Sequence, residues 1–205
     1  TSSFNRRSGA ATDTFDIDAE LTGAVDGKAG TDTMQGTEID PVGLVGSDGD
    51  GFGGAEAGVT NDFDGIDTAT ETGAGSLCVG SAGSKWALDG TPTYNDGCNT
   101  LEFTGFATLQ DGTNTDAFNV TAASSFNLNG GAANDTFDID ADLTGAVDGE
   151  AGTDTLQVTE IDTVALTGSD GDGFAAAEAV VTNDFDGIDT ATETGAGSLC
   201  VGSAG

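Results

Sequence analysis

The chain has 205 residues and a formal net charge of −32, because 36 acidic residues face only four basic ones. Nucleic acids and anionic membrane surfaces bind clustered Lys and Arg, so this charge excludes both classes of partner. The absence of histidine excludes serine triads and histidine-containing metal sites, and it leaves carboxylates as the acid–base and metal-binding side chains. No apolar run is long enough to predict a membrane span.

A tandem repeat dominates the sequence. Residues 1–83 align with residues 123–205 at an offset of 122, and 68 of these 83 positions are identical. Residues 84–122 occur once. We therefore expect a first repeat unit at residues 1–122, an incomplete second copy at 123–205, and one continuous structure. Because the second copy stops inside the pattern, we expect the chain to be a segment of a longer protein.

A shorter period of about 20 residues runs through each repeat. An Asp stands two positions before an apolar residue at steps of 19, at Asp116, Asp135 and Asp154. With steps that vary more in length, the same series includes Asp13, Asp32, Asp50, Asp67, Asp96, Asp172 and Asp189. A period this short is typical of one rung of a solenoid, in which each rung buries its apolar face only when a neighbour stacks on it.

The local sequence predicts strands. DTFDIDADL and DTLQVTEI alternate apolar and polar residues, and Gly, Asn and Asp mark turns every few residues. We predict an all-β fold, a parallel β-solenoid of the right-handed β-helix type with rungs of about 20 residues. Residues one rung apart would stack into two inward ladders, Phe118, Phe137 and Leu156 in one and Val120, Ile139 and Val158 in the other.

Tandem antiparallel β-sandwiches, one for each repeat, are the alternative fold. They account for the offset of 122 between the two copies. They do not account for the recurrence of Asp, Phe and Gly at the shorter period within each copy, and this recurrence favours the solenoid.

Three segments carry a resemblance to known repeats: DGTNTDAFNV at 111–120, GGAANDTFDI at 130–139 and GEAGTDTLQV at 149–158. They resemble the repeats of large secreted bacterial surface proteins, including filamentous-haemagglutinin-like exoproteins and adhesins, and more loosely the RTX β-roll proteins. The resemblance implies an extracellular or cell-surface location and an adhesive or fibre-forming role. The chain departs from the RTX nonapeptide GGxGxDxUx, because its rungs are longer and only one Asp per rung is regular. This departure speaks against the RTX scheme of calcium coordination.

Two acidic clusters, SDGDG and NDFDGID, recur in both copies. They place several carboxylates around a glycine, and Ca²⁺ prefers oxygen ligands of this kind. The candidate calcium ligands are Asp48, Asp50, Asp62, Asp64 and Asp67, and in the second copy Asp170, Asp172, Asp184, Asp186 and Asp189. Neither cluster has the spacing of an EF-hand loop. The alternative is a set of solvated turns, for which Asp and Gly have a high propensity.

Cysteines and aromatic residues supply further candidates. Cys78 and Cys98 are about one rung apart, so we predict that they stack and form a disulfide. Such a bond indicates an oxidising, extracellular compartment. Trp86 and Tyr94 lie in the single-copy segment and are candidate sugar-binding residues.

These observations predict an extracellular structural protein, a stiff acidic fibre, stalk or matrix filament that stacks head to tail with itself or continues as a repeat array. The alternative is an adhesin module that binds a carbohydrate or surface ligand through residues 84–122 and is stiffened by calcium. We predict that the chain is not an enzyme, because an active site is unique whereas nearly every carboxylate here belongs to a repeated series.

Overall fold

The computed structural model describes residues 6–37, 39–56, 59–79, 83–159, 164–177, 181, 183–193 and 199–201. Every regular element in these ranges is a β-strand, as the alternating sequence predicts. Contacts divide the chain into two compact units, which we call the first unit (Thr1–Ala82 with Thr91–Leu109) and the second unit (Gly83–Gly90 with Gln110–Gly205). The single-copy segment is therefore divided between the two units.

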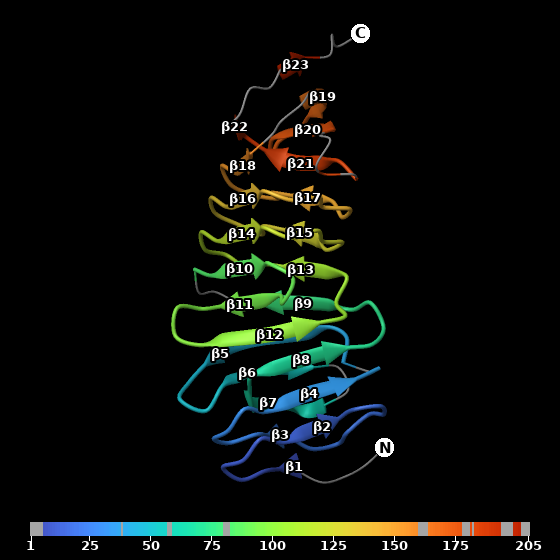
Figure 1. The fold of residues 1–205 in the computed structure, drawn as a ribbon, viewed down its shortest axis with the longest axis vertical. Helices are drawn as coiled ribbons and strands as arrows, with labels where there is room; N and C mark the ends of the chain where they lie inside the picture. The colour runs from blue at the N-terminus through green and yellow to red at the C-terminus, as the bar shows by residue number, and fades with distance from the viewer. Residues whose placement is uncertain are drawn as a thin grey trace. The chain divides into compact units, whose positions relative to one another are not determined.

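The first unit contains two sheets, with strand orders β1-β3-β7-β6-β5-β9-β13 and β2-β4-β8-β12-β11 (Figure 1). The β5–β6–β7 meander and the β11–β12 hairpin are antiparallel, whereas pairs such as β2–β4, β4–β8 and β5–β9 are parallel. The strands are β1 (Arg6–Arg7), β2 (Thr14–Asp16), β3 (Val25–Asp26), β4 (Thr33–Gly36), β5 (Val42–Ser47), β6 (Phe52–Glu56), β7 (Val59–Ile66), β8 (Thr68–Glu71), β9 (Ser76–Val79), β11 (Thr93–Asn95), β12 (Thr100–Thr104) and β13 (Thr108–Gln110).

The second unit also contains two mostly parallel sheets, with orders β15-β17-β21-β20-β19-β23 and β10-β14-β16-β18-β22. Its antiparallel part is the β19–β20–β21 meander. The strands are β10 (Lys85–Leu88), β14 (Ala117–Val120), β15 (Asn127–Asn129), β16 (Thr136–Ile139), β17 (Val147–Asp148), β18 (Thr155–Val158), β19 (Val164–Ser169), β20 (Phe174–Ala177), β21 (Phe185–Ile188), β22 (Thr190–Glu193) and β23 (Leu199–Val201).

In the second unit, strands β14, β16 and β18 recur every 19 residues and pair in the register that this spacing predicts. Phe118 pairs with Phe137, which pairs with Leu156, and the second predicted ladder pairs in the same way two residues further on. Both ladders are confirmed, and their side chains are buried. Trp86 extends the first ladder. Its ring stacks on Phe118 at 5.6 Å and 3°, and Phe118 stacks on Phe137 at 5.0 Å and 11°. All three rings of this stack are fully buried.

The predicted rungs that begin at Asp50 and Asp172 are wrong. Strand β18 pairs directly with β22, which places Leu156 opposite Ala191, and β4 pairs directly with β8, which places Met34 opposite Ala69. In both copies the residues between these strands form an antiparallel meander in the other sheet. The turns that hold Asp50 and Asp172 therefore lie outside the ladder.

The aspartates before the ladder strands are linked to one another. In the second unit the backbone N–H of Asp116 donates to Oδ1 of Asp135 (2.8 Å), Asp135 N–H donates to Oδ1 of Asp154 (2.7 Å), and Asp154 N–H donates to Oδ2 of Asp189 (2.9 Å). Asp13, Asp32 and Asp67 are linked in the same way in the first unit. We call these residues the aspartate columns. The accepting carboxylates, those of Asp32, Asp67, Asp135, Asp154 and Asp189, each satisfy a backbone donor of the preceding step, which explains why the Asp recurs.

Candidate functional site

An acidic depression of about 380 Å³ lies in the second unit. Asp148 at the end of β17 pairs with Asp186 in β21, and the turn between β19 and β20 adds two further aspartates. The residues that line it are Asp148, Glu150, Ala151, Asp170, Asp172, Asp186 and Gly187. Five carboxylates thus border one depression.

Backbone hydrogen bonds fix the carboxylates around this depression. Oδ1 of Asp170 accepts the N–H of Asp172 (2.9 Å), and Oδ1 of Asp148 accepts the N–H of Glu150 (2.9 Å). The Glu150 carboxylate also accepts a bond of 3.0 Å from the side-chain amide of Gln110. These neutral donors orient the acids but leave their charge uncompensated.

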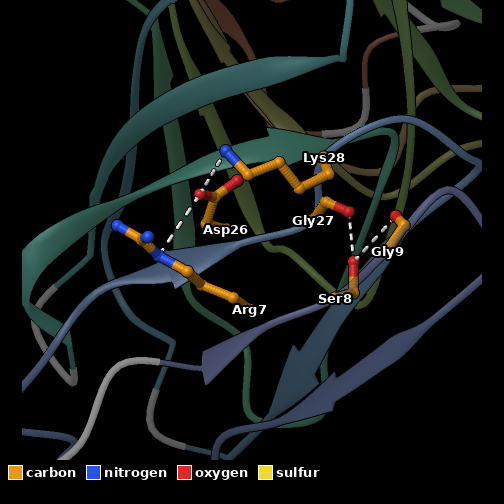
Figure 2. Close-up of polar contacts among 6 residues, drawn as sticks. All are labelled: Arg7, Ser8, Gly9, Asp26, Gly27 and Lys28. Carbon is orange, nitrogen blue, oxygen red and sulfur yellow. Dashed lines mark hydrogen bonds and ion pairs between the residues drawn. The ribbon is translucent and has the colours of Figure 1, made fainter.

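The first copy carries a different charge at the equivalent place. Lys28 occupies the position of Glu150, and its Nζ lies 2.6 Å from Oδ2 of Asp26, the equivalent of Asp148. Arg7 Nε lies 3.7 Å from the same oxygen, and Figure 2 shows both cations directed at the Asp26 carboxylate. A depression of about 270 Å³ nearby is lined by Val45, Gly46, Ser47, Asp48, Gly53 and Asp64. The first copy therefore provides its own counter-ions.

The predicted calcium ligands separate into groups. Asp170, Asp172 and Asp186 border the depression of the second unit, and Asp48 and Asp64 border that of the first. The carboxylates of Asp67 and Asp189 instead accept bonds within the aspartate columns. Asp50, Asp62 and Asp184 are exposed and line neither depression. Among the residues that the structure describes, no three acidic or cysteine side chains are grouped closely enough to hold a metal ion.

Sequence reasoning missed Asp148, Glu150 and Lys28. Asp148 and Glu150 lie far along the chain from the two clusters and come next to them only through the pairing of β17 with β21. A signal was present, because the exchange of Lys28 for Glu150 is one of the few differences between the copies and reverses the charge.

A second polar cluster is buried in the second unit. Ser84 Oγ donates to Oδ2 of Asp111 (2.9 Å) or Oδ1 of Asp116 (2.8 Å), and the indole N–H of Trp86 donates to Oδ2 of Asp111 (2.6 Å). Burial raises the pKa of Asp111 to about 7 and also raises the pKa of Asp116. The indole is fully buried, so Trp86, a candidate sugar-binding residue, presents no exposed face in this structure.

Burial also raises the pKa of three further aspartates, which belong to the aspartate columns. It raises the pKa of Asp135 to about 7 against an ordinary value of 3.8, and it raises the pKa of Asp32 and Asp154. In each of these three residues Oδ2 is buried without a hydrogen-bond partner. Desolvation of a charge that has only one hydrogen-bonded oxygen outweighs the backbone bond that favours ionisation.

The remaining candidates lie in the first unit. Tyr94, the other candidate sugar-binding residue, is buried against Phe52, with ring centroids 5.7 Å apart, and so packs as a core residue. Cys78 and Cys98 are free thiols, and the predicted disulfide is not formed. Cys78 lies opposite Gly43 in the β5–β9 pair, whereas Cys98 is exposed in a turn in which Asp96 accepts its N–H. The two cysteines therefore do not occupy successive rungs.

In the described part of the chain, the structure contains no helix of the length and apolarity that crossing a membrane requires. No protein-family model, curated protein or solved structure matches the chain. The resemblance to secreted exoprotein repeats thus remains a prediction.

Proposed function

We propose that the chain is an extracellular structural repeat protein whose units are segments of a parallel β-solenoid, and that they build a stiff acidic fibre, stalk or matrix filament. The observation that carries this proposal is the in-register parallel pairing of the successive strands β14, β16 and β18. Each such strand buries its apolar face only with its neighbours in place, as in quasi-one-dimensional repeat proteins. Parallel pairing of this kind is not expected of antiparallel sandwiches.

Electron microscopy of the purified chain tests the fibre. We expect filaments of uniform width whose steps rise by about 4.8 Å along the axis. Discrete particles at every protein concentration would contradict self-assembly of the chain. The chain could then act only as a rigid spacer within a larger protein.

A second candidate function is an adhesin module whose second copy binds calcium. The acidic depression in the second unit favours it, because five carboxylates border the depression where the first copy places Lys28 beside Asp26. Since the carboxylates are not already grouped as ligands, Ca²⁺ would have to draw them together, and binding would stiffen the β17, β19, β20 and β21 region. Exposed aromatic residues for a carbohydrate are not part of this candidate, because Trp86 and Tyr94 are buried.

Calcium binding can be tested by giving the second copy the charge that the first copy carries at the equivalent position. Ca²⁺ at 100 times its dissociation constant would stabilise the folded chain by about 2.7 kcal/mol. We expect Glu150→Lys, which copies the ion pair of the first unit, to abolish this gain in thermal melts. Asp142→Lys is the matched control, because it changes the charge equally at an exposed residue outside the depression. If both variants lost the same amount of calcium-dependent stabilisation, the stabilisation would come from general screening of negative charge and not from a site at Glu150.

A further inference from the structure

The hairpin formed by the SDGDG turn has the same local geometry in both copies. In the first copy the N–H of Asp48 donates to the carbonyl of Gly51 (2.9 Å), and in the second copy Asp170 donates to Gly173 (3.0 Å). Oδ1 of the first turn aspartate accepts the N–H of the second in both copies, at 2.8 and 2.9 Å. The turn is therefore formed in the same way whatever covers it.

The surroundings of the two hairpins differ. Phe52 at the start of β6 is 1% exposed, whereas its equivalent Phe174 at the start of β20 is 45% exposed. Both residues occupy the same position in their meanders, because Phe52 pairs with Ile66 and Phe174 with Ile188. The difference thus reflects what packs on the hairpin in each copy.

In the first unit the cover is the β11–β12 hairpin, residues 91–104 of the single-copy segment. Tyr94 packs on Phe52, the Asp96 carboxylate accepts a 2.5 Å bond from the hydroxyl of Ser47, and the Asn99 side-chain amide donates to the carbonyl of Asp48. Burial alone would raise the pKa of Asp96, but bonds from Asn99, Ser47 and Cys98 outweigh it and lower this pKa. One aromatic contact and two polar contacts define this interface.

The second copy keeps the receiving side of this interface. Phe174, Ser169 and Asp170 are the equivalents of Phe52, Ser47 and Asp48, and all three are exposed. The offset of 122 places the equivalent of Tyr94 at position 216, outside the 205 residues of the chain. The second copy therefore exposes the same three residues that the β11–β12 hairpin covers in the first copy.

We propose that the surface around Phe174, Ser169 and Asp170 is a docking site for a β-hairpin of the β11–β12 type, with a Tyr that covers Phe174, an Asp that accepts from Ser169 and an Asn that donates to the carbonyl of Asp170. The partner is a further copy of the 91–104 sequence that is not already packed on its own β5–β6 hairpin. This inference deepens the proposed structural role by naming how successive repeats recognise each other, but its test needs no filament.

The first test uses a fluorescently labelled peptide that spans residues 91–104 and carries Cys98→Ser. The full chain is titrated into this peptide, and binding is measured by fluorescence anisotropy. The buffer contains 0.5 M NaCl to screen the repulsion between the two acidic partners. We expect saturable binding that weakens at least tenfold in the Phe174→Ala chain and with a Tyr94→Ala peptide. Val45→Ala is the matched control, because it removes another exposed apolar side chain, 78% exposed, and binding should be unchanged. Equal binding to the Phe174→Ala chain would overturn the proposal, as would Phe174-dependent self-association that the peptide does not displace.

A free peptide pays the entropy of ordering when it binds, so a second measurement places the partner in the same chain. A copy of residues 84–122 is appended after Gly205, and the alkylation rate of a Ser169→Cys variant that lacks the native cysteines is compared with and without this extension. We expect at least tenfold protection, and its loss when the appended tyrosine is replaced by alanine. Unchanged alkylation in the extended chain, together with absent peptide binding, would refute the docking site even if filaments form.

Discussion

The backbone N–H of Asp135 donates a hydrogen bond of 2.7 Å to Oδ1 of Asp154, the aspartate one step further along the chain. The carbonyl of Asp135 in turn accepts the N–H of Thr155, at 2.9 Å. Successive steps are therefore joined through both backbone groups of one aspartate, and one of these links needs a side-chain acceptor. Four predictions concern this linkage, the glycines beside it and the thiols.

Replacement of Asp135 separates its role as an acceptor from its charge. Asp135→Asn keeps an oxygen for the N–H of Asp116, whereas Asp135→Ala leaves that buried donor unpaired at a cost of about 1–3 kcal/mol. We expect the Asn variant to exceed the Ala variant in free energy of unfolding by this amount in urea titrations at pH 8. Equal stabilities of the two variants would show that the hydrogen bond contributes nothing.

The chain should become more stable as the pH falls from about 8 to about 5. The pKa of Asp135 is about 7 in the folded state against an ordinary value of 3.8, so between these values the unfolded chain loses a proton that the folded chain retains. Stability therefore falls as pH rises through this window, and the loss is complete above the folded pKa. Below the ordinary value both states are protonated, so stability no longer changes with pH and the full gain from this group is present.

Urea titrations across this range measure the slope. We expect Asp135→Asn to flatten the dependence of unfolding free energy on pH, because the variant lacks the titrating carboxyl. The control Asp142→Asn, at an exposed residue, should leave this dependence almost unchanged. A slope that responds equally to both substitutions would assign the pH dependence to net charge rather than to the buried column.

Gly149 packs directly against the aspartate column. A Cβ at this position would lie 2.1 Å from the carbonyl oxygen of Gly187 and 2.9 Å from Oδ2 of Asp154. Gly149→Ala should therefore cost about 1–3 kcal/mol or more through overpacking. Gly168→Ala, where a Cβ would meet no atom within 4 Å, is the control and should stay within about 0.5 kcal/mol of the native chain. Similar melting temperatures for the two variants would refute the close approach.

The thiols should react at different rates. Cys98 is exposed and Cys78 is half-buried, and burial followed by the charge of Asp40 raises the pKa of Cys78. In a Cys200→Ser chain we expect fast alkylation of Cys98, slow alkylation of Cys78, and no effect of a reductant on stability. If a reductant instead lowered the free energy of unfolding by about 3 kcal/mol, a disulfide would be indicated.

The register of the second unit could be predicted because burial of one strand face repeats the same residues at the same step. Phe118, Phe137 and Leu156 satisfy that condition without any knowledge of the turns. The pairing of Leu156 with Ala191 could not be read from the period, because an Asp two positions before an apolar residue serves two structural purposes.

The residue after each Asp distinguishes these purposes. In the aspartate columns the next residue is Thr or, once, Ala, which continues into a strand, as in Asp135 followed by Thr136. In the turns the next residue is Gly, which adopts the positive φ that the turn requires, as at Gly97 (93°) and Gly173 (151°). The pattern of Asp and apolar residues at Asp50, Asp96 and Asp172 thus belongs to turn chemistry. Grouping these with the column residues produced the wrong steps and the wrong position for Cys98.

The acidic depression was beyond sequence reasoning for a different reason. Asp148 and Asp186 become neighbours only because β17 pairs directly with β21. In the sequence these two strands are separated by β18 and the β19–β20 hairpin. The two acidic clusters in the sequence include Asp186 but give no indication of Asp148. Long-range parallel pairing is therefore what assembles the candidate site.

The links of the aspartate columns span 19 residues in some steps and 35 in others, as between Asp154 and Asp189, yet the bond is the same. Chain length between two linked aspartates is thus free to change, provided that the Asp and the strand after it are retained. Insertions at the tips of the meanders, at residues 47–51 and 169–173, would consequently spare the parallel ladders, but at 47–51 they would disrupt the contacts with the β11–β12 hairpin. A family of such arrays could diversify its surface by loop length while its core stayed constant.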